Sequence, residues 1–164
     1  MILYYAWNCI WLVIPILLMN VLLMKKLPKI YQTEFFSNGI PAWISFGENA
    51  FRIAIFTLPL LMPLYPAKFS QKIGLGVYLA GVILYFLSWA MQIWFPRSQW
   101  SMSRCGFMAS GFTPLLWLIG VALVGNSLYV AISYTPWVYI VLSIAFLIFH
   151  NLHCWRVYTL ARNG

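Results

Sequence analysis

Long apolar runs, separated by short polar stretches, dominate the chain and predict membrane-spanning helices. Five runs occur, at residues 1–24, 41–64, 73–95, 107–125 and 137–155. A helix needs about 20 apolar residues to cross a bilayer, and each run comes close to that length. None alternates apolar and polar positions, and all exceed the roughly 10 residues of a membrane-barrel strand. We therefore predict an all-α fold, a polytopic helical membrane bundle of about five transmembrane helices.

Composition agrees with this pattern. Of the 164 residues, 63% are hydrophobic, 19% are aromatic and only 7% are charged, far from the composition of a soluble domain. The short loops predict a single integral membrane domain over residues 1–164, with the lipid bilayer as its surroundings. A net charge of +8 would point to nucleic acid in a soluble protein. Here the basic residues lie mainly between the apolar runs, so we expect no nucleic-acid partner.

The placement of these basic residues predicts an orientation, because cytoplasmic loops carry an excess of Lys and Arg. With the N-terminus outside and the C-terminus cytoplasmic, two basic residues fall outside, Lys68 and Lys72. Arg52 lies inside the second run. The cytoplasmic side then holds the other seven, which are Lys25, Lys26, Lys29, Arg97, Arg104, Arg156 and Arg162.

The stretch SFGENAFR, residues 45–52, places charges inside the second run. If a helix starts near Pro41, then Ser45, Glu48, Asn49 and Arg52 share one face at spacings of three and four. A charge at the bilayer centre costs from about 3 to more than 10 kcal/mol, so this face should contact protein or water. Glu48 four residues before Arg52 is the favourable order for an ion pair.

Three interpretations of this pair remain open. The pair could be structural, with the two charges neutralising each other and fixing the helix packing. Alternatively, the second span could start only at about Phe51, which would leave residues 38–50 as a surface helix. A third interpretation is a ligand-binding or catalytic role.

Further polar residues share the cytoplasmic half under this topology, and they favour a functional role. They are Asn20, Ser88, Gln92, Ser110, Thr113, His150, Asn151 and His153, accompanied by the aromatic residues Trp43, Trp89 and Trp117. Ordinary interhelical hydrogen bonds, at about 0.6 kcal/mol each, are the simpler explanation. A cytoplasm-facing intramembrane polar pocket is the functional one. Its predicted ligand-binding residues are Ser45, Glu48, Asn49, Arg52, Trp89, Gln92, His150 and His153.

The segment FHNLHCW carries both histidines and Cys154 on one helical arc. Imidazole and thiolate at this spacing can bind a transition metal, but three ligands on one helix rarely complete a site. We instead expect His150 and His153 to lie at an interface or to bond the Glu48 face, and we predict no metal site. Cys9, Cys105 and Cys154 are an odd number at different depths, which indicates no disulfide framework.

Absent residues exclude several chemistries. The chain has no aspartate, and its second carboxylate, Glu34, lies in a loop, so a paired-carboxylate site is not available. No signature of a Ser–His–acid triad, a Walker loop or a dinucleotide fold occurs. In GLGVYLAG we expect Gly76 and Ala80 to allow close helix packing.

The leading hypothesis is a small multi-pass membrane protein that binds a lipophilic or amphipathic small molecule. Arg52 would meet an anionic group, with Glu48 as counter-ion. The second is a membrane enzyme acting on a lipid or isoprenoid, with Glu48 as catalytic acid or base and His150 assisting. The third is an accessory subunit that contacts another membrane protein or a second copy of the chain.

The charge distribution yields a testable orientation. Reporter fusions at residue 1 and at residue 164 should respond from opposite sides of the membrane, with the C-terminal reporter in the cytoplasm. Two reporters on the same side would contradict an odd number of spans.

Overall fold

Helices form nearly all of the regular structure. The computed structural model describes residues 6–28, 31 and 39–163, so Lys29, Glu34 and the start of the first apolar run lie outside it. The elements are α2 (Ile10–Met24), α4 (Ala42–Thr57), the short 3-10 helix η2 (Leu58–Leu61), α5 (Phe69–Trp94), α6 (Gln99–Met102), α7 (Arg104–Phe112), α8 (Pro114–Val124) and α9 (Pro136–Asn163).

Among the residues that the structure describes, four segments are long and apolar enough to cross a membrane. They are Ala42–Leu61, Phe69–Trp94, Arg104–Val124 and Pro136–Leu160, the third formed by α7 and α8 together. The all-α, integral, multi-pass character predicted from sequence is thereby confirmed. Helix α2 is apolar but has only 15 residues in the described part of the chain. A fifth span and the orientation remain predictions.

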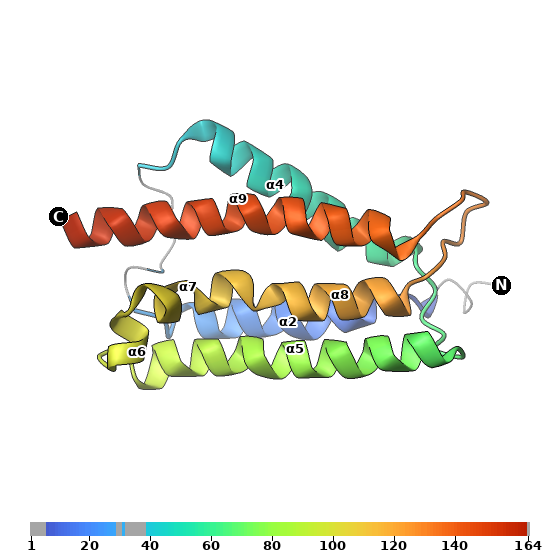
Figure 1. Ribbon diagram of the computed structural model, residues 1–164, viewed down its shortest axis with the longest axis horizontal. Coiled ribbons are helices and arrows are strands. Elements are labelled where there is room, and N and C mark those ends of the chain that lie inside the picture. Colours follow the sequence, from blue (N-terminus) through green and yellow to red (C-terminus); the bar gives the residue numbers. More distant parts are fainter. Residues whose placement is uncertain (1–5, 29–30, 32–38, 164) are drawn as a thin grey trace.

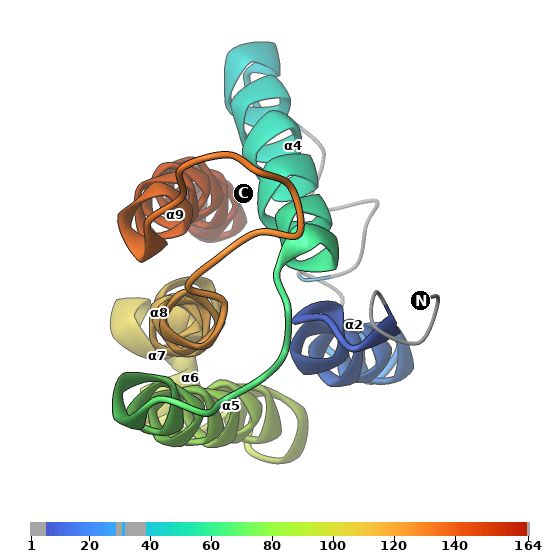
Figure 2. The same ribbon diagram turned by 90° about the vertical axis from the view of Figure 1, so that its right-hand side faces the viewer.

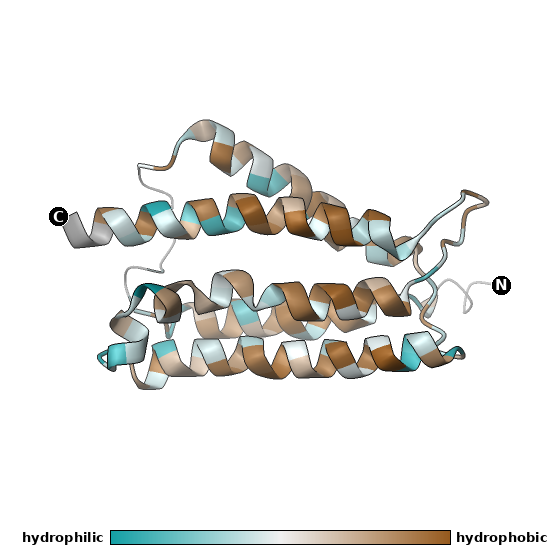
Figure 3. Cartoon of the chain, in the orientation of Figure 1, coloured by the Kyte–Doolittle hydropathy of each residue, from teal (hydrophilic) through white to brown (hydrophobic). Residues whose placement is uncertain are grey.

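The long helices run alternately up and down one axis. In Figure 1, α2, α4, α5, the α7–α8 pair and α9 follow one another in opposite directions. Figure 2 shows the bundle end-on, with α5 beside α8 and α4 beside α9. Helix α2 contacts α4 only sparsely. Colouring by hydropathy shows mainly apolar helices, with hydrophilic positions inside α4 and in the C-terminal half of α9 (Figure 3).

Prolines set both ends of α4. The helix starts at Ala42, directly after Pro41, whose ψ of 135° lies outside the helical range. It ends at Thr57, two residues before Pro59, which has no N–H to continue the helical ladder. One helix thus carries residues 42–57 without interruption. The helix runs through Phe51 without a break, so residues 42–50 do not form a separate surface helix, and the point at which the span begins stays a prediction.

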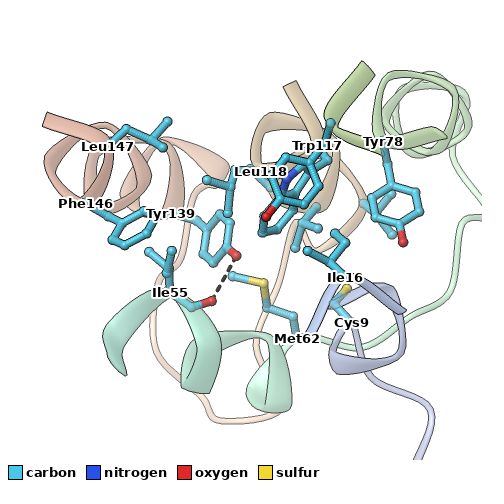
Figure 4. Close-up of a cluster of buried hydrophobic side chains, with 14 residues drawn as sticks. Cys9, Ile16, Ile55, Met62, Tyr78, Trp117, Leu118, Tyr139, Phe146 and Leu147 are labelled. Atoms are coloured by element: carbon cyan, nitrogen blue, oxygen red, sulfur yellow. Dashed lines mark hydrogen bonds between the residues drawn. The ribbon is translucent and has the colours of Figure 1, made fainter. Parts of the chain in front are cut away.

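A hydrophobic core fills the half of the bundle where α2 begins (Figure 4). Buried tyrosines tie its helices together, since Tyr139 donates to the carbonyl of Ile55 at 2.9 Å and Tyr78 to that of Leu12 at 2.7 Å. These bonds satisfy carbonyls and hydroxyls that would otherwise be unpaired in an apolar medium.

Glycines allow α5 and α8 to approach closely, although not at the residues expected from sequence. A Cβ on Gly81 would overlap the backbone nitrogen of Trp117, and one on Gly120 would overlap the backbone of Tyr78. At Gly76 an added Cβ would meet nothing within 4 Å, and Ala80 is exposed. The expectation for Gly76 and Ala80 is therefore wrong, because the partner helix packs on another face of α5.

Two matched substitutions test this contact. Gly81→Ala should destabilise the fold by about 1 to 3 kcal/mol, because the methyl group forces the helices apart. Gly76→Ala adds the same methyl group on an open face and should be neutral or stabilising by up to about 1 kcal/mol. Thermal unfolding in detergent, followed by tryptophan fluorescence, measures both. Equal effects would contradict the proposed contact.

Candidate functional site

The carboxylate of Glu48 lies at the centre of a charge cluster. Its side chain is only 3% exposed and contacts nitrogen donors from two helices. Arg52 donates to Oε1 from one turn along α4. From α9, His150 Nδ1 lies 2.9 Å from Oε1 and His153 Nδ1 lies 2.5 Å from Oε2. The predicted ion pair and the expected histidine bonds to this face are both present.

Tight packing of α4 against α9 brings these groups together. Gly47 precedes Glu48, and the ring of Phe149 occupies the space that a side chain at Gly47 would need. Phe149 also stacks on Phe51, with ring centroids 5.7 Å apart. His150 and His153 are three residues apart on α9, so both rings reach the same carboxylate.

Arg52 reaches from the buried carboxylate to an exposed position. Its side chain is 41% exposed, in contrast to that of Glu48. A second guanidinium nitrogen donates to Asn49 Oδ1 at 2.9 Å, and the ring centroid of Phe146 lies 5.8 Å away. The interior location predicted for the pair therefore holds for Glu48, whereas Arg52 keeps an open side.

The charge cluster borders a cavity of about 550 Å³. All eight residues predicted from sequence as ligand contacts line it: Ser45, Glu48, Asn49, Arg52, Trp89, Gln92, His150 and His153. They come from three helices, α4, α5 and α9, that are distant in sequence. The structure thus shows that these eight residues lie around one cavity, and their role in binding a ligand stays a prediction.

The two walls of this cavity differ in chemistry. Helices α4 and α9 supply the ionisable groups around Glu48. The facing wall is mainly apolar and aromatic and contains Ile16, Leu17, Val21, Met24, Tyr85, Trp89, Pro114 and Trp117. On this wall Tyr85 donates to Asn20 Oδ1 at 2.6 Å, which pairs two polar groups with each other. The cavity is thus lined by charged groups on one side and by apolar groups on the other.

Several lining residues were not predicted as ligand contacts. Tyr85 could have been predicted from sequence, because it precedes Trp89 by four residues and Gln92 by seven and therefore shares their helical face. Tyr31 could not have been predicted in this way, since it lies in a connection between helices. Its hydroxyl donates to the carbonyl of Phe107 at 3.2 Å, and burial raises the pKa of this phenol.

Other residues that the sequence placed at this depth do not line the space. Ser88 and Thr113 donate to backbone carbonyls three and four residues earlier in their own helices, and Asn151 donates across to the carbonyl of Gly111 on α7. Trp43 is 60% exposed and lies outside the lining, so its predicted place there is wrong. It lies on the opposite side of α4 from the cavity because it is offset from the Ser45–Arg52 face.

The candidate metal ligands form no metal-binding group in the described part of the chain. No cluster of three or more His, Cys, Asp and Glu side chains there could hold an ion.

Comparisons with protein families, with curated proteins and with solved structures found no match for this chain. The cavity and its charge cluster are consequently the features from which a function has to be inferred.

The unequal burial of the two charges predicts unequal mutational costs. Glu48→Leu leaves buried donors without their acceptor and should destabilise by about 3 to 5 kcal/mol. Arg52→Leu should cost about 1.5 to 3 kcal/mol, as for one hydrogen bond to a charge, because two imidazoles still bond the carboxylate. The double variant should lose less than the sum. Unfolding free energies from titration with denaturing detergent measure all three.

Arg97→Leu provides the control for loss of an arginine. Arg97 is exposed beyond the end of α5, so the change should stay within about 0.5 kcal/mol. Additive effects of the Glu48 and Arg52 substitutions would contradict their coupling.

Proposed function

We propose that this protein binds a lipophilic or amphipathic small molecule in the intramembrane cavity. The observation that carries the proposal is the cavity of about 550 Å³ beside the Glu48 cluster. Ligand pockets of about 300–1,000 Å³, mostly apolar with a few placed polar groups, are typical of small-molecule sites. The opposed charged and apolar walls fit a molecule with a polar head and a hydrocarbon body.

The head group is proposed to be anionic. Glu48 already accepts bonds on both oxygens, so it offers little to a cationic ligand. Arg52 is partly exposed and retains N–H groups beyond those used by Glu48 and Asn49. A carboxylate or phosphate can accept from these donors in a geometry that suits guanidinium. The hydrocarbon body would then lie along α2 and α5.

Entry is proposed between α2 and α4. These helices contact each other sparsely, and each contributes an exposed residue to the lining, Val21 from α2 and Asn49 from α4. An amphipathic molecule could enter there from the lipid phase without leaving the membrane. The cavity also lies towards the end of the bundle that carries Lys25, Lys26 and Arg97, which supports the cytoplasm-facing side.

An enzyme acting on a lipid or isoprenoid is the second candidate. Direct proton transfer by Glu48 would require displacement of at least one of its three donors. The same bonds orient His150, which makes the imidazole the better placed proton carrier. Any catalytic role of Glu48 would therefore be to position His150.

Photolabelling can test the binding proposal. Photoreactive, alkyne-tagged palmitic acid and the matching alcohol should both label cavity-lining peptides of α2 and α5 in the purified protein. Arg52→Leu should weaken labelling by the acid about tenfold or more, equivalent to about 1.4 kcal/mol, and spare the alcohol. Ser110→Trp should reduce labelling by both, because it fills the cavity.

Phe112→Trp is the control, since Phe112 lies on the same helix but is exposed and outside the lining. Labelling unaffected by Ser110→Trp, or confined to peptides outside the lining, would contradict the proposal. Native mass spectrometry of gently extracted protein would instead favour the accessory-subunit hypothesis if it showed a stoichiometric protein partner and no small molecule.

A further inference from the structure

Cys154, His150 and Glu48 form a continuous chain of contacts at the cavity. The thiol sulfur of Cys154 lies 3.9 Å from His150 Nε2, and His150 Nδ1 lies 2.9 Å from Glu48 Oε1. Cys154 and His150 are one turn apart on α9, and Glu48 comes from α4. All three residues line the cavity.

This arrangement places each hydrogen where nucleophilic catalysis needs it. An ionised carboxylate only accepts, so the bond to Glu48 keeps the His150 hydrogen on Nδ1. Nε2 then presents a lone pair towards the thiol and can take its proton. A nucleophile, a base and a third group that orients the base are the elements of a catalytic triad. The longer sulfur–nitrogen distance is compatible with a site that tightens when substrate binds.

The surroundings of the thiol suit an acyl group. Cys154 is 5% exposed but borders the cavity, whose facing wall is apolar enough for a hydrocarbon chain. On the neighbouring helix, Gly111 faces this part of α9, since an added Cβ would lie 2.9 Å from Asn151 Oδ1 and 3.4 Å from the sulfur. One lining residue, Trp117, has a buried N–H group with no hydrogen-bond partner in the described part of the chain. A carbonyl oxygen that accepted from this group would satisfy it.

We propose that Cys154 is an acyl-accepting nucleophile that reacts with long-chain acyl thioesters held in the cavity. This inference rests on the proposed function, because the same apolar wall would bind the acyl chain. His150 Nε2 removes the thiol proton, and the sulfur attacks the acyl carbonyl carbon. A new carbon–sulfur bond forms to Cys154 as the bond to the leaving thiol breaks. The departing thiolate takes the proton back from His150, so no oxidant or reductant is needed.

The other two cysteines lack this arrangement. Cys105 is exposed at the start of α7. The buried thiol of Cys9 lies 3.7 Å from the carbonyl of Pro63, at the other end of the bundle. Both histidines of the chain lie on α9, next to Cys154. Simple chemical acylation would favour the exposed Cys105, whereas a catalysed reaction should select the buried Cys154.

Incubation with alkyne-tagged palmitoyl-coenzyme A, followed by peptide mass spectrometry, tests this selection. The wild-type protein should gain one hydroxylamine-sensitive acyl group, located on Cys154. Cys154→Ser should abolish this modification, and Cys105→Ser should leave it unchanged. His150→Gln should slow it about a hundredfold or more, the usual contribution of general acid–base catalysis. Acylation mainly at Cys105, or an unchanged rate in His150→Gln, would overturn the inference.

Photolabelling with tagged palmitic acid separates this inference from the binding proposal. Labelling of the cavity in Cys154→Ser and His150→Gln shows that both variants fold and still bind the chain. Cavity labelling of the wild-type protein without acylation of Cys154 would overturn the nucleophile and leave the binding function intact. Loss of both would overturn both.

Discussion

The bond pattern of the Glu48 carboxylate is the constraint around which this half of the bundle is organised. An isolated carboxylate at this depth would be costly, and here three nitrogen donors surround it. One donor is local, one turn along α4, and two come from α9. Because the acceptor and most of its donors lie on different helices, the carboxylate joins α4 to α9 and adds to the packing of Gly47 and Phe51 against Phe149. The orientation of both imidazole rings follows from this.

The cavity follows from a difference between the two ends of the bundle. At one end apolar side chains and buried tyrosines fill the interior, and glycines bring α5 and α8 into backbone contact. At the other end α4 is held to α9 by the charge cluster and contacts α2 only sparsely. Polar side chains directed inward cannot pack as densely as interlocking aliphatic ones, since they must keep their hydrogen-bond geometry. The charge cluster and the cavity are therefore two aspects of the same packing.

Sequence predicted the features that depend on a single segment better than those that depend on contacts between segments. Apolar run length and the spacing of Ser45, Glu48 and Arg52 are properties of single segments, so they identified the helices and the face. The depth of Gln92 and His150 required only a topology, and both line the cavity. Sequence does not show how one helix is rotated about its axis relative to its neighbour, so contacts that depend on this rotation could not be predicted. For this reason Gly76 was predicted in place of Gly81. Tyr31 could not be predicted as a lining residue for another reason, because connections between helices have no regular spacing of residues on one face.

The chemistry of the site depends on how fully Glu48 is engaged. Were one oxygen free to bind a substrate, Glu48 would be the natural acid or base, which is its role in the enzyme hypothesis drawn from sequence. With both oxygens accepting, Glu48 can instead act through His150, because it bonds the ring nitrogen that faces away from Cys154. In the proposed relay, the proton moves from the thiol to the imidazole and leaves an adjacent thiolate and imidazolium, so neither new charge is isolated in the apolar bundle. A membrane interior that excludes isolated charges can thus still hold a reactive side chain, provided the charge that orients it is bonded on every side.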